Sequence, residues 1–93
     1  MITTAIQVER QVSPSRLGEL GVTAWPIWSK EVSEFSWVYD TQETCYLLAG
    51  RVRVTPEQGE VVEFGQGDLV TFPAGLRCTW TVLEPVRKHY QFA

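Results

Sequence analysis

The stretch that decides the fold is GDLVTFPAG, residues 67–75. Its centre, residues 69–72, is a short run of β-forming and apolar side chains between two groups of turn residues. The first glycine suits a tight reversal with a positive φ angle, and Asp68 can hydrogen-bond to the turn backbone. Pro73 and Gly75 follow at a corner where the hydrogen-bond ladder has to pause. We therefore predict a short strand between two tight turns, with these residues holding the fold rather than performing chemistry.

The same pattern extends over residues 22–93. Short β-rich segments alternate with turn residues at the close spacing that is typical of a sandwich or barrel. No linker or low-complexity stretch separates them, so we expect one all-β barrel domain whose strands close on one another. The predicted strands are residues 22–29, 34–39, 44–48, 51–55, 61–64, 69–72, 77–83 and 86–92.

Residues 1–21 predict two further elements that pack on this barrel. Apolar and polar residues alternate over residues 2–9, which is the pattern of a half-buried strand. Ser13 can cap a helix, Pro14 suits its first position and Gly21 can end it. We therefore expect an N-terminal strand followed by one helical turn.

The composition fits a small globular protein and counts against several kinds of partner. The chain has 93 residues and a hydrophobic fraction of 44%, which is enough for one small core. Its 8 basic and 11 acidic residues give a formal net charge of −3, which argues against nucleic-acid binding. No apolar run approaches the roughly 18 residues of a membrane helix, and the first residues lack the features of a signal peptide. Two isolated cysteines, Cys45 and Cys78, fit a reduced, cytoplasmic protein better than a disulfide scaffold.

Two of the predicted turns carry the spacings of a known family. Glu43 is followed after six residues by Gly50, as at the end of the first cupin motif. Gly67 is followed after five residues by Pro-Ala-Gly, as in the second cupin motif. The chain therefore resembles the cupin superfamily. Further residues that carry the resemblance are Trp37-Val38-Tyr39, Cys45-Tyr46-Leu47-Leu48, Asp68, Phe72, Cys78, Trp80 and Lys88-His89-Tyr90.

The resemblance is greatest to the small single-domain branch of that superfamily. This branch includes the cupin domain of (S)-ureidoglycine aminohydrolase and the ethanolamine-utilisation cupin. It implies a small jelly-roll barrel for residues 22–93 and a homodimer. An N-terminal strand with an exposed edge also favours a dimer, and Trp25 and Trp28 are candidates for contact with the partner subunit.

The resemblance also implies a metal site, which this sequence does not reproduce. Metal-binding cupins use two histidines and a glutamate from the first motif and a histidine from the second. The matching positions here are Trp37, Tyr39, Glu43 and Cys78, so only the glutamate is kept. Indole has no lone pair for a metal, and a neutral phenol is a poor ligand. We therefore expect no metal and no other cofactor, which counts against a metal-dependent aminohydrolase activity.

Strand parity predicts which side chains line the interior. If Trp37 and Tyr39 face inward, each neighbouring strand has a defined inward face. On the last strand, the alternate residues that include Lys88 are far more apolar than those that include His89, so Lys88 should point inward and His89 outward. Aromatic faces attract flat or cationic ligands, although plain core packing is the alternative. The predicted ligand pocket consists of Trp37, Tyr39, Glu43, Cys78, Trp80 and Lys88, with Tyr90 as a further aromatic neighbour.

Glu43 needs a partner inside the barrel because an isolated buried charge is costly. Lys88 is the only basic residue that parity brings inward, so its ammonium group can replace the missing metal cation. Two alternatives stay open: Glu43 holds a proton, or Lys88 reaches solvent while backbone donors satisfy Glu43.

Cys78 has three interpretations. It packs as a small, inert hydrophobic residue. It acts as a nucleophile, for which Lys88 is the only candidate to lower the thiol pKa. It binds zinc together with Cys45 and Glu43.

For function, we expect a metal-independent protein that binds a small molecule. The first alternative is a hydrolase-type enzyme that acts on a small nitrogen-containing metabolite, with Glu43 as general acid or base. The second is a non-catalytic interaction module in a larger assembly. A filled barrel would favour the interaction module, and an open cavity that ends at Glu43 would favour binding or catalysis.

Overall fold

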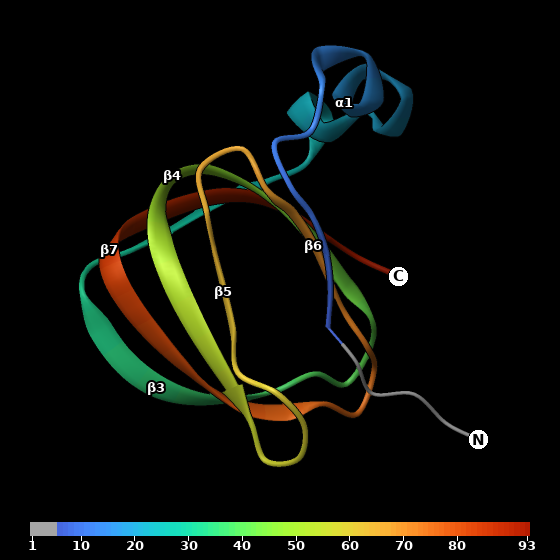
Figure 1. Cartoon of the computed structure of the whole chain (residues 1–93). Coiled ribbons are helices and arrows are strands. Elements are labelled where there is room, and N and C mark those ends of the chain that lie inside the picture. Colours follow the sequence, from blue (N-terminus) through green and yellow to red (C-terminus); the bar gives the residue numbers. More distant parts are fainter. Residues whose placement is uncertain (1–5) are drawn as a thin grey trace.

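The computed structural model describes residues 6–93 and has an antiparallel β-barrel with one short helix outside it (Figure 1). The all-β prediction is confirmed. Within residues 6–93, no helix is long and apolar enough to cross a membrane. The elements in chain order are β1 (Gln7–Glu9), α1 (Pro14–Leu20), a 3-10 turn (Val22–Ala24), β2 (Ile27–Lys30), β3 (Ser33–Val38), β4 (Glu43–Pro56), β5 (Val62–Gly65), β6 (Leu69–Phe72) and β7 (Arg77–Phe92).

Two long strands, β4 and β7, lie side by side and join the two halves of the barrel (Figure 1). In one half the strand order is β1-β6-β4-β7-β2. In the other half β5 pairs with β4, and β3 pairs with β7. Every strand except β1 therefore pairs directly with β4 or β7, and β1 pairs with β6.

Both long strands continue through positions where the sequence predicted turns. We expected breaks at Ala49-Gly50 and at Glu84-Pro85, and this expectation is wrong. The pairing of β4 with β7 is instead irregular between Leu47 and Val52, which is the signature of β-bulges. A bulge bends a strand without ending it, and it uses the same glycine and proline signals as a turn.

The N-terminal segment contains the predicted helix, but it differs from the prediction in two places. Ser13 caps α1 by accepting a hydrogen bond from the Arg16 N–H, and Gly21 ends the helix with φ +69°. The helix has seven residues, which is about two turns instead of one. Of the predicted strand over residues 22–29, only the end forms a strand, in β2, while Val22–Ala24 form the 3-10 turn. Of the predicted strand at residues 2–9, the part before residue 6 lies outside the described residues.

The turn before β6 forms as the sequence indicates. Gly67 has φ +91°, and the Asp68 carboxylate accepts hydrogen bonds from the Gly65 and Gln11 N–H groups. The Arg10 guanidinium donates to the same carboxylate at 3.1 Å. Asp68 therefore ties the chain that follows β1 to the turn between β5 and β6.

Gly50 is the tightest point of the bend in β4. Its φ is +93°, and an added Cβ would lie 2.2 Å from the Pro85 carbonyl oxygen. The bend in β4 thus contacts the backbone of β7 directly, with no room for a side chain.

We predict that Gly50→Ala lowers the free energy of unfolding by about 2–5 kcal/mol. About 1–2 kcal/mol comes from the left-handed backbone and about 1–3 kcal/mol from overpacking against β7. Urea denaturation measures this loss. Gly18→Ala is the matched control, because Gly18 lies in α1 with open space around it and should gain about 0.5–1 kcal/mol. Equal effects of the two substitutions would contradict the close contact at the bend.

Candidate functional site

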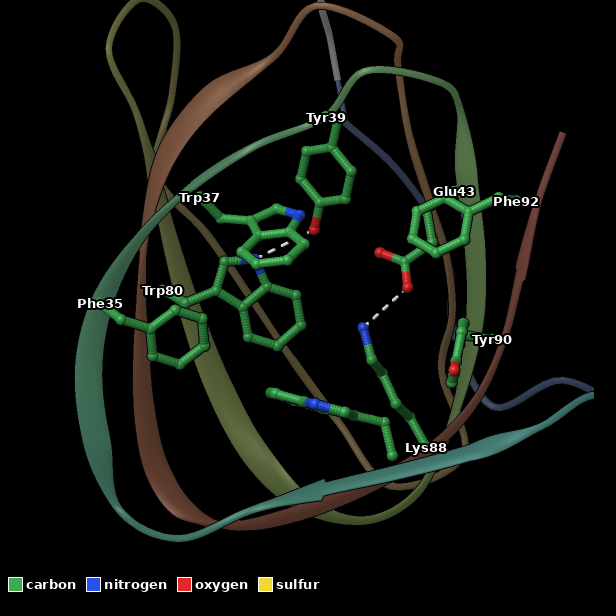
Figure 2. Close-up of a pocket in the computed structure, with 9 residues that line it drawn as sticks. Phe35, Trp37, Tyr39, Glu43, Trp80, Lys88, Tyr90 and Phe92 are labelled. Atoms are coloured by element: carbon green, nitrogen blue, oxygen red, sulfur yellow. Dashed lines mark hydrogen bonds and ion pairs between the residues drawn. The ribbon is translucent and has the colours of Figure 1, made fainter.

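A cavity of about 180 Å³ opens inside one part of the barrel (Figure 2). Its lining comes from β2, β3, β4 and β7 and from the residue that follows β3. Trp37 and Phe92 are each nearly half exposed, so the cavity is open to solvent beside them. The lining residues are Trp28, Phe35, Trp37, Tyr39, Glu43, Trp80, Lys88, Tyr90 and Phe92.

Strand register brings these residues together from distant parts of the chain. On β7, Trp80, Lys88, Tyr90 and Phe92 occupy alternate positions and so share one face. Three of these β7 residues have an aromatic or acidic residue directly opposite on a neighbouring strand. The cross-strand pairs are Phe35 with Trp80, Trp28 with Lys88, and Glu43 with Phe92.

The polar centre of the cavity is an ion pair between Lys88 and Glu43. The Lys88 Nζ donates to Glu43 Oε2 at 2.9 Å. Lys88 is 5% exposed and Glu43 3% exposed, so Lys88 does not reach solvent. Of the three partners considered for Glu43, the geometry selects the ammonium of Lys88.

Three aromatic rings lie near the Lys88 ammonium, which also faces the cavity. Nζ lies 4.6 Å from the ring centre of Trp80, 5.1 Å from that of Trp28 and 6.0 Å from that of Tyr90. Such cation–π contacts contribute about 2 kcal/mol when they are desolvated, so the rings help to hold the ammonium beside Glu43.

The second carboxylate oxygen of Glu43 is turned toward the cavity. Figure 2 shows Oε2 directed at Lys88, and the other oxygen, Oε1, pointing into the cavity on the side of Tyr39 and Trp37. Among residues 6–93, the hydrogen bond to the Glu43 carboxylate comes from Lys88 and goes to Oε2. Oε1 is thus available as an acceptor for an incoming molecule.

Trp80 separates the cavity from the filled part of the barrel. One side of its ring stacks on Phe35 with centres 6.0 Å apart, and its Nε1 donates to the Tyr39 hydroxyl at 3.1 Å. It also packs against Phe64 and Phe72 in the core. The floor of the cavity is therefore closely packed, and its exposed side chains lie at the outer rim.

Five of the six predicted pocket residues line this cavity, namely Trp37, Tyr39, Glu43, Trp80 and Lys88. The sixth, Cys78, does not: its Sγ lies 3.7 Å from the Trp37 carbonyl oxygen, outside the lining. Burial, assisted by the charge of Glu43, raises the pKa of the Cys78 thiol to about 11. The thiol is thus protonated at neutral pH, as expected for an inert packed cysteine.

Three lining residues were missing from the predicted pocket. Phe35 and Phe92 share strand parity with Trp37 and Lys88, so the alternation along their strands could have found them. Trp28 was considered as a contact to a partner subunit, but its ring lies inside the barrel beside Lys88. Its place depends on the pairing of β2 with β7, which no local pattern reveals.

His89 points away from the cavity, yet it is not on an open surface. Its Nδ1 lies 2.9 Å from the Trp25 carbonyl oxygen, and the residue is 8% exposed. His89 faces away from the cavity, as expected, but it is not exposed to solvent because the segment before β2 covers it.

The residues at the cupin ligand positions do not form a metal-binding set. The Trp37 indole offers no lone pair, and Glu43 is engaged by an ammonium group. Burial, reinforced by the charge of Glu43, raises the pKa of the Tyr39 hydroxyl far above its ordinary value, so the phenol stays protonated. Within the described part of the chain, no three His, Cys, Asp or Glu side chains lie close enough to hold a metal ion.

The barrel and its motifs agree with a comparison to known families. The EutQ-like cupin domain family matches residues 17–90. The chain belongs to this cupin family. A comparison with curated proteins found no match.

Solved structures of other cupins have the same fold. A DUF861 family protein from Thermotoga maritima is 58% identical and superimposes with a TM-score of 0.92, covering 96% of this chain and 100% of its own. The EutQ protein of Clostridium difficile is 21% identical with a TM-score of 0.65, over 71% of this chain and 52% of its own. This cupin thus spans about half of that EutQ chain, and the likeness there concerns the fold alone.

We predict strong energetic coupling between Glu43 and Lys88 in this cupin. Glu43→Gln or Lys88→Met leaves one buried group without its partner and should lower the free energy of unfolding by about 3 kcal/mol each. The double variant should lose less than the sum by about 1–3 kcal/mol, because neither charge then remains. Urea denaturation of the four proteins gives the coupling energy.

The exposed pair of Arg53 and Glu63, 3.0 Å apart, serves as the control. A surface pair of this kind should show coupling below about 1 kcal/mol. Additive losses at Glu43 and Lys88 would mean that the buried pair makes no specific contribution.

Proposed function

We propose that this cupin is a metal-independent protein that binds a small organic molecule in its barrel. The observation that carries the proposal is an aromatic cavity of about 180 Å³ with a single ion pair at its base. Ligand sites are mostly apolar clefts with a few fixed polar groups, and this cavity has that composition. The cavity is smaller than the roughly 300–1,000 Å³ of drug-sized sites, so it suits a ligand of about one ring.

The ammonium of Lys88 takes the part that a metal cation plays beside the motif glutamate in metal-binding cupins. It neutralises Glu43 and fixes the carboxylate by a 2.9 Å hydrogen bond. The negative charge of Glu43 is therefore balanced by a residue of the same chain, and ligand binding needs no metal.

The two other functions have less support. A hydrolase would use Glu43 as general acid or base, but Lys88 already engages this carboxylate and Cys78 lies outside the cavity lining. An interaction module that uses the barrel only as a scaffold would have no need for an open cavity. Two free, buried cysteines support a cytoplasmic location.

We predict that small planar fragments bind the protein equally well with and without EDTA, as measured by ligand-observed NMR. Trp37→Ala, at the rim of the cavity, should weaken binding about 3- to 10-fold through loss of one aromatic contact. Val61→Ala is the control, since Val61 is exposed and does not line the cavity. Loss of binding with EDTA, a stoichiometric metal in the purified protein, or no bound fragment would each overturn the proposal.

We also propose that the chain forms a homodimer through the outer edge of β3. Among the described strands, β3 pairs only with β7, so its other edge has free backbone N–H and C=O groups. Val38 on β3 and the nearby Val32 are both about half exposed or more. An exposed strand edge with apolar side chains favours pairing with a second copy.

Light scattering should therefore give a mass of about 21 kDa, which is twice 10.6 kDa. Val38→Lys should shift the protein to the monomer, because a lysine on an edge strand opposes pairing. Val61→Lys, at an equally exposed valine next to β5, should not. A monomeric wild-type protein, or equal effects of the two lysines, would refute this interface.

A further inference from the structure

The ion pair at the base of the cavity also limits the charge of a ligand. Lys88 and Glu43 cancel each other, so the site has no net charge from its lining. A charged ligand would lose hydration in an apolar cavity without meeting an opposite net charge. The cavity therefore disfavours simple cations and simple anions alike.

Each sign of charge also meets a specific obstacle. The aromatic faces that would attract a cationic ligand already surround Nζ of Lys88, so a second cation would lie beside a like charge. An anion attracted by Lys88 would lie next to Glu43 Oε1, which points into the same space (Figure 2). Like charges at such short range are destabilising.

The same two groups favour a ligand with one donor and one acceptor side by side. Oε1 of Glu43 is a hydrogen-bond acceptor and needs an N–H or O–H from the ligand. The Lys88 ammonium has three N–H donors, of which Glu43 takes one. Glu43 Oε1 lies close to Lys88 Nζ because Oε1 and Oε2 belong to one carboxylate and Oε2 is hydrogen-bonded to Nζ. A donor and an acceptor on one planar group of a ligand can therefore reach Oε1 and Nζ at the same time.

We propose that the cavity binds a neutral, planar molecule of about one ring that carries an amide-type group. The N–H of that group donates to Glu43 Oε1, and its carbonyl oxygen accepts from Lys88 Nζ. The apolar ring then lies among the aromatic side chains, with Trp37 and Phe92 at the rim. This inference rests on the proposed binding function and names its ligand class, a primary carboxamide or a lactam.

Three compounds of nearly identical shape test the proposal: benzamide, benzoate and benzamidine. At pH 7 they are neutral, anionic and cationic, and only benzamide offers a donor and an acceptor together. Dissociation constants of the full chain are measured by ligand-observed NMR. We expect benzamide to bind at least about 10-fold more tightly than either charged compound, since each of these leaves one polar group unpaired.

Removing the negative charge of Glu43 should shift the ligand preference from the neutral compound toward the anionic one. In Glu43→Gln the site keeps only the positive charge, so benzoate should gain about 10-fold relative to benzamide. Glu84→Gln removes the same charge from an exposed surface position and should leave the order unchanged. If Glu43→Gln does not fold, the wild-type series still decides the question.

The outcomes separate the ligand class from the binding function. If benzoate or benzamidine binds as tightly as benzamide, the amide class is wrong and the small-molecule site stands. If planar fragments bind but none of the three compounds does, the amide class is again wrong. If no fragment of any charge binds, the proposed function fails and the ligand class fails with it.

Discussion

The buried contact between Lys88 and Glu43 is the constraint around which the open part of the barrel is arranged. A carboxylate and an ammonium inside an apolar barrel are costly unless they meet each other with good geometry. Their 2.9 Å hydrogen bond meets this requirement, and the rings of Trp28 and Trp80 cover the ammonium. The aromatic residues thus do more than fill the core, because they stabilise the Lys88 ammonium that holds Glu43 in place.

This contact exists because β4 and β7 are long and bent. Glu43 starts β4, and Lys88 lies on the second part of β7 beside it, opposite Leu47. The bend at Gly50 lets one pair of strands serve both halves of the barrel, so the β3 residues reach the same cavity as Glu43. A straight β4 would separate the aromatic wall from the ion pair.

The sequence predicted which side chains face the barrel interior better than it predicted where strands bend and which strands pair. The alternation of apolar residues on the last strand correctly predicted that Lys88 points inward. The spacing from Glu43 to Gly50 indicated the first cupin motif. The sequence around Gly50 and Pro85 predicts turns where the structure has bulges, because both structures use glycine and proline to interrupt a ladder. The position of Trp28 could not be predicted, since it follows from the pairing of two strands about sixty residues apart, and single-strand patterns contain no pairing information.

The pairing of β4 with β7 also bears on how this chain reaches its native state. Glu43 pairs with Phe92, so residues 49 positions apart must meet before the sheet is complete. Among the described strands, β2 and β3 pair only with β7, so neither can dock before β7 is in place. Closing such a long loop costs chain entropy before the new contacts form, which slows folding in proteins with distant pairings. The barrel should therefore close in a late, cooperative step, after synthesis of the C-terminal strand.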